Sequence, residues 1–167
     1  MANEQSKVLI LSVIDSLVTL SDKFYAGMAK WRQPANANQS NTVALAHLSA
    51  VWMKSIESAE VLRDNIRRTF AGPNYLADQK RALGPAQDIF ENLRSMKSQI
   101  IGGTATVRVT QSFASKQFAG MINVAVRDLN LIAGYLQKNE IISPGSKAVI
   151  DEKIAGLSER ESMSRAA

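Results

Sequence analysis

The sequence contains no cysteine and a single histidine, His47. The absence of cysteine excludes disulfides, thiolate metal sites and cysteine nucleophiles. No acidic residue lies near His47 in the sequence, so this histidine has neither a local triad partner nor the spacing of a metal-ligand set. We therefore expect His47 to be solvated or to cap a helix, and we expect no metal ion and no cofactor.

Signatures of nucleotide sites and of common catalytic sites are also missing. Gly102 and Gly103 form a glycine pair, but neither further glycines nor a Lys-Ser or Lys-Thr pair follows, as a phosphate-binding loop requires. No serine stands in a Gly-x-Ser-x-Gly elbow. The carboxylate pairs all have lysine or arginine nearby, which is typical of an exposed helix face. The sequence thus predicts a protein that is not an enzyme and has no small-molecule substrate.

Long hydrophobic runs are scarce. The most apolar stretch, residues 8–20, is interrupted by Asp15. It is shorter than the roughly 20 apolar residues of a membrane-spanning helix. A signal peptide would not normally contain this carboxylate or follow Glu4. We predict no transmembrane helix, no signal peptide, and a soluble protein in the cytoplasm or in a particle assembled there.

What the sequence does contain is helical periodicity. Apolar residues recur at three- and four-residue steps along most of the 167 residues, which predicts an all-α fold. Four long helices are expected: residues 4–31, Ser40 or Asn41 to about Phe70, Pro85 to the Gly102–Gly103 pair, and residues 111–138. Trp31 and Trp52 are expected in the core.

Shorter elements complete the predicted bundle. Residues 74–83 are expected to form a short helix or turn, which Gly84 and Pro85 separate from the third long helix. A last short helix begins at residues 143–146. We predict one helical-bundle domain over residues 1–157, with short extra helices, and a polar, mobile tail over residues 158–167.

Residues 104–110, with the sequence TATVRVT, depart from this helical pattern. Val107 and Val109 alternate with polar residues as in a strand, and no other segment of the sequence favours β-structure. Two interpretations remain open. The segment is either an extended connector between helices or an arm that pairs with another copy of the protein, because an unpaired strand edge is a template for pairing.

The first predicted helix is apolar nearly all the way round, and such a helix is usually buried on more than one side. A bundle that places this helix centrally is one explanation. Our leading hypothesis is instead a non-enzymatic structural protein that self-associates into an oligomer or ordered assembly, as a coat, capsid shell or filament subunit does. The self-association residues of this hypothesis are Val8, Leu9, Leu11, Val18, Val107 and Val109.

Acidic residues are missing from long stretches, although the chain has 20 Lys and Arg and 15 Asp and Glu in total. Between Glu91 and Asp128 all charged residues are positive: Arg94, Lys97, Arg108, Lys116 and Arg127. If these residues lie on the same face of the bundle, their side chains could contact phosphates. The alternative hypothesis is therefore a helical module that binds the nucleic-acid backbone. No aromatic platform for bases accompanies them. Coating of an anionic lipid surface is disfavoured by Asp15 and Asp22.

Overall fold

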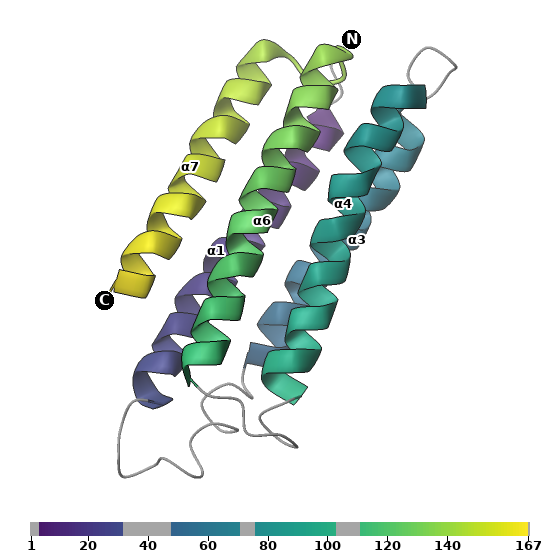
Figure 1. Ribbon diagram of the computed structural model, residues 1–167. Helices are drawn as coiled ribbons and strands as arrows, with labels where there is room; N and C mark the ends of the chain where they lie inside the picture. The colour runs from purple at the N-terminus through teal and green to yellow at the C-terminus, as the bar shows by residue number, and fades with distance from the viewer. Residues whose placement is uncertain (1–3, 32–47, 71–75, 103–110, 167) are drawn as a thin grey trace.

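The computed structural model describes residues 4–31, 48–70, 76–102 and 111–166 (Figure 1). These ranges contain five α-helices: α1 (Glu4–Trp31), α3 (Leu48–Thr69), α4 (Leu76–Lys97), α6 (Gln111–Lys138) and α7 (Pro144–Ala166). A π-helical segment, η3 (Ser98–Gly102), extends α4. The predicted all-α fold is confirmed, and no strand occurs within the described ranges.

Some of the residues for which predictions were made lie outside the residues that the structure describes. The connector at residues 104–110, with Val107, Arg108 and Val109, lies outside the described residues, and so does His47. The side chain of Trp31 is likewise outside them.

The described helices form a closed ring around a shared core (Figure 1). In chain order, each helix packs against the next, and α7 packs back against α1. Figure 1 shows that successive helices run in opposite directions. Because five is an odd number, one neighbouring pair must be parallel, and this pair is α1 with α7.

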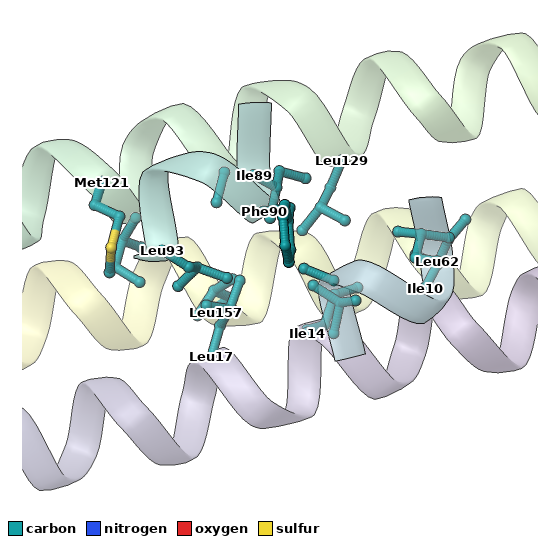
Figure 2. Close-up of a cluster of buried hydrophobic side chains, with 14 of the residues drawn as sticks. Ile10, Ile14, Leu17, Leu62, Ile89, Phe90, Leu93, Met121, Leu129 and Leu157 are labelled. Atoms are coloured by element: carbon teal, nitrogen blue, oxygen red, sulfur yellow. The ribbon is translucent and has the colours of Figure 1, made fainter. Parts of the chain in front are cut away.

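The core is aliphatic along most of its length, and all of the described α-helices contribute side chains to it (Figure 2). Aromatic rings fill one part: Phe24 stacks on Phe118 with ring centroids 4.0 Å apart, and Trp52 meets Phe118 edge-on. The indole Nε1 of Trp52 donates a hydrogen bond to the Leu93 carbonyl oxygen at 2.8 Å. This bond satisfies the donor of a fully buried ring, so Trp52 lies in the core as predicted.

The predicted break at Gly84 and Pro85 is wrong. Both residues lie inside α4, which continues unbroken from Leu76. Proline has no N–H, so one helical hydrogen bond is missing at this point. Ala82 and Ala86 are nevertheless fully buried on either side of the pair, because the same face of α4 packs into the core before and after it. Packing therefore outweighs the local preference of these residues for a break.

The prediction of a short last helix is also wrong, because α7 continues through Ala166. Leu157 is fully buried, and one helical turn later the buried position is taken by Glu161, which is 0% exposed. The hydroxyl of Tyr25 on α1 donates a hydrogen bond to Glu161 Oε1 at 2.6 Å. Arg160 binds both carboxylate oxygens of Asp22, with Nη2 to Oδ2 at 2.7 Å. Polar contacts therefore dock the stretch whose composition predicted a tail.

The turn between α6 and α7 is determined locally. Glu140 adopts a positive φ of 58°, and the Ile141 N–H donates to the Leu136 carbonyl oxygen at 2.9 Å. This pattern is the Schellman motif that commonly ends a helix. Ser143 Oγ then accepts the Ser146 N–H at 3.0 Å and caps α7. The chain is thereby reversed within a few residues, which places α7 beside α6.

Gly84→Ala is expected to stabilise the protein, because α4 is helical at this residue and a Cβ there would meet no atom within 4 Å. Alanine is favoured over glycine in a helix interior by about 0.5–1 kcal/mol. The melting temperature should rise by about 1–4 °C, as measured by circular dichroism. Gly134→Ala in α6, where a Cβ also meets nothing, is the matched control. A gain in the control alone would contradict a continuous α4.

Tyr25→Phe is expected to destabilise the protein by about 1–2 kcal/mol, because it removes a hydrogen bond of the buried Glu161 side chain. The melting temperature should fall by about 2–8 °C. Arg160→Gln is the comparison: it removes an ion pair whose arginine side chain is 56% exposed, and such pairs contribute little. If neither change affects thermal unfolding, the end of α7 is not docked on α1.

Candidate interaction surfaces

The apolar residues of α1 that were predicted to mediate self-association do not share one environment. Leu9, Leu11 and Val18 are partly buried and pack against the core, whereas Val8 is 59% exposed. α1 is flanked by α3 on one side and α7 on the other. Much of its apolar surface is therefore covered by its own chain, as expected for a helix that is apolar nearly all round.

An open groove with a volume of about 560 Å³ nevertheless lies on the outside of the bundle, between α1 and α3. The hydroxyl of Ser55 on α3 donates to the Ser16 carbonyl oxygen of α1 at 3.3 Å and joins the two walls. The residues that line the groove, hereafter the α1–α3 groove, are Val8, Leu11, Ser12, Asp15, Ser16, Thr19, Val51 and Lys54. It combines apolar side chains with one acidic and one basic side chain.

The two charged residues of this groove are exposed and come from opposite walls, Asp15 from α1 and Lys54 from α3. Within the described ranges, neither residue forms an ion pair. Elsewhere in the described ranges some charges are paired, for example Lys147 with Asp151 at 2.7 Å, and others, such as Glu152 and Lys153, form no ion pair. The groove therefore presents opposite charges that the described part of the chain leaves uncompensated.

Two of the predicted phosphate contacts, Arg94 and Arg127, make contacts within their own chain. Arg94 of α4 lies beside α3: its guanidinium is 5.4 Å from the centroid of the Phe90 ring, which Arg63 of α3 also contacts at 4.5 Å. Arg127 of α6 instead binds Asp128 at 3.3 Å. Lys97 lies at the end of α4, Lys116 is exposed on α6, and Arg108 lies outside the described residues.

Neighbouring carboxylates reduce the positive charge further. Asp64 lies 3.2 Å from Arg63 and 3.5 Å from Arg67. Asp78, at the start of α4, accepts a hydrogen bond from Asn139 at 2.9 Å and pairs with Lys138 at 3.3 Å. The Asn139 hydrogen bond, together with Lys138, holds the pKa of Asp78 below its ordinary value. These carboxylates therefore bind arginine and lysine side chains within the fold.

Asp128 is a buried carboxylate that sequence reasoning missed. Its side chain is 1% exposed, and Oδ2 has no hydrogen-bond partner among the described residues. Burial raises the pKa of Asp128; Arg127 opposes this effect, and the negative charge of Asp88 on α4 adds to it. The available signal was its position three residues after Ala125 and directly before Leu129, within the apolar stripe of α6.

No group of three or more histidine and carboxylate side chains in the described ranges could hold a metal ion. None of the helices in the same ranges has both the length and the apolar character that crossing a membrane requires. A second open groove, of about 510 Å³, lies where the end of α7 meets Asp22, next to the exposed Met163. The charged residues that line it within the described ranges are Glu159 and the Asp22–Arg160 pair.

No protein-family model matches this chain, and neither a curated protein nor a solved structure matches it. Functional inference therefore depends on the geometry of the described residues.

Asp128→Asn is expected to stabilise the protein at pH 7. Because the pKa of Asp128 is raised above 3.8 in the folded protein, folding favours its protonated form, and this contribution to stability is lost as pH rises through the folded pKa. A buried carboxylate oxygen without a hydrogen-bond partner costs about 1–3 kcal/mol, so the amide should raise the melting temperature by about 2–10 °C. The gain should disappear below pH 3.8, where the parent carboxyl is protonated in both states.

Asp88→Asn is the control for this experiment, because it removes only the repulsion from the exposed neighbour. It should give a smaller gain than Asp128→Asn at neutral pH. A lower melting temperature for Asp128→Asn at pH 7 would show that the ionised carboxylate stabilises the fold.

Proposed function

We propose that this protein is a non-enzymatic structural subunit that self-associates into an oligomer or ordered assembly, of the coat, shell or filament type. The observation that carries this proposal is the α1–α3 groove. Interfaces between protein copies combine an apolar centre with complementary polar groups at their margins. The groove offers apolar contact through Val8 and Val51, and opposite charges through Asp15 and Lys54.

Self-association accounts for this surface better than phosphate binding does. A nucleic-acid backbone would meet the Asp15 carboxylate in the groove, and elsewhere Arg127 and Arg63 are bound to acidic neighbours. Backbone binding depends on several cations free to replace counterions along one track.

The exposed apolar residues elsewhere in the described ranges do not form a second patch of this kind. The exposed large apolar residues outside the groove, Met53, Val61, Leu76, Phe113, Leu131 and Met163, are spread over several helices. Scattered exposure of this kind is ordinary for a soluble domain. An extended assembly needs at least one further interface, since a two-fold contact alone closes at a dimer. Val107 and Val109 remain the sequence candidates for it.

The test is the mass of the full-length protein in solution, measured by size-exclusion chromatography with light scattering from about 1 to 100 µM, where association of ordinary affinity is populated. We expect a multiple of the 18.2 kDa chain mass, with electron microscopy separating closed oligomers from extended assemblies. Nuclease treatment and high salt remove bound nucleic acid from the measured mass. A monodisperse 18.2 kDa species at all concentrations overturns the proposal.

A further inference from the structure

We infer that the α1–α3 groove is occupied by the same groove of a second copy, in a two-fold dimer in which Asp15 of each copy pairs with Lys54 of the other. The dimer rests on the self-association proposed above and gives that association a location and a symmetry. Three properties of the groove support this dimer: its two opposite charges, its apolar side chains and its zero net charge among the described residues.

A two-fold interface uses the same patch on both copies, so the patch must complement itself. A patch with charges of one sign would repel its copy, whereas a patch with one acid and one base forms two equivalent ion pairs. The α1–α3 groove has this composition, with Asp15 on one wall and Lys54 on the other. Both charges are exposed and make no ion pair within the described ranges.

The apolar residues of the groove supply contact area between the charges. Val8 is 59% exposed, and it lies one helical turn from Leu11 on the same wall, while Val51 projects from α3. Covering these side chains with those of a second copy removes apolar surface from water. Ser12 and Thr19 on the same wall are small hydroxyl residues, which leave room for the side chains of a second copy.

Local neutrality distinguishes the groove from the chain as a whole. The protein carries a net charge of +5, so two copies repel one another over most orientations. Among the described residues, Asp15 and Lys54 are the only charged ones that line the groove, and their charges cancel. Contact through this surface therefore avoids the repulsion that contact through the arginines of α3 and α4 would add.

The test is charge reversal. Asp15→Lys places lysine against Lys54 of the second copy, and Lys54→Glu places glutamate against Asp15, in both cases twice per dimer. Like charges at an interface cost several kcal/mol, so each single variant should weaken dimerisation by at least about 100-fold. Sedimentation equilibrium measures the dissociation constants. Circular dichroism should show unchanged helicity, because both positions are exposed.

Two combinations test the pairing itself. The double variant Asp15→Lys with Lys54→Glu restores opposite charges and should dimerise with the parent affinity within about tenfold. A mixture of the two single variants should form a heterodimer. The introduced lysine of one variant then faces the introduced glutamate of the other, and the unchanged Lys54 faces the unchanged Asp15. Native mass spectrometry distinguishes this heterodimer from either variant alone.

Glu152→Lys and Lys153→Glu on α7 are the matched controls, because both residues are exposed and lie outside the groove. These variants should keep the parent dissociation constant. A parent protein that is monomeric overturns both the proposed function and the dimer. A parent that associates, together with single variants that associate equally well, overturns only the dimer. Monomeric single variants without rescue overturn the pairing, and larger alternating chains in the mixture overturn the two-fold symmetry.

Discussion

The structure depends on the closure of the helix ring by α7. Without α7, the faces of α1 and α6 that it covers would be exposed, and Ile154 and Leu157 would lose their buried environment. The closing pair is parallel, so the helix dipoles of α1 and α7 point the same way and do not favour each other. Apolar burial along α7, followed by the Tyr25–Glu161 hydrogen bond near its end, holds the pair together.

The spacing of apolar residues in the sequence predicted the bounds of some helices correctly and of others incorrectly. The apolar steps from Ala114 to Leu136 located α6 at the bounds seen in the structure, since one face of that helix is continuously apolar. The same approach failed at Pro85, where the propensity of two residues is weaker than the burial of the face around them. It failed again in α7, because Glu161 occupies a core position and its partner Tyr25 is far away in the sequence.

Only some of the residues that line the α1–α3 groove could be predicted from the sequence. Val8 and Leu11 were identified from α1 alone, but so were Leu9 and Val18, since an apolar pattern does not reveal which neighbour covers each residue. Lys54 comes from the opposite wall and carries no signal of its own. The stretch without acidic residues was defined as ending before Asp128, so this residue was left out of the prediction. In the structure the Asp128 carboxylate binds Arg127 and neutralises its charge.

Among the described residues, charges that form ion pairs within the chain and charges that form none have different consequences for a binding surface. Asp22, Asp78 and Asp64 bind cations of their own chain, so changing them alters contacts within or between helices of the bundle. Asp15 and Lys54 are exposed and make no such pair in the described ranges, so changing their charges breaks no ion pair there. Charges that make no ion pair within the chain can be changed, and a binding partner gained or lost, with little effect on the free energy of unfolding. Self-association through the α1–α3 groove is therefore separable from folding, whereas binding through the paired arginines would compete with the ion pairs that the fold already uses.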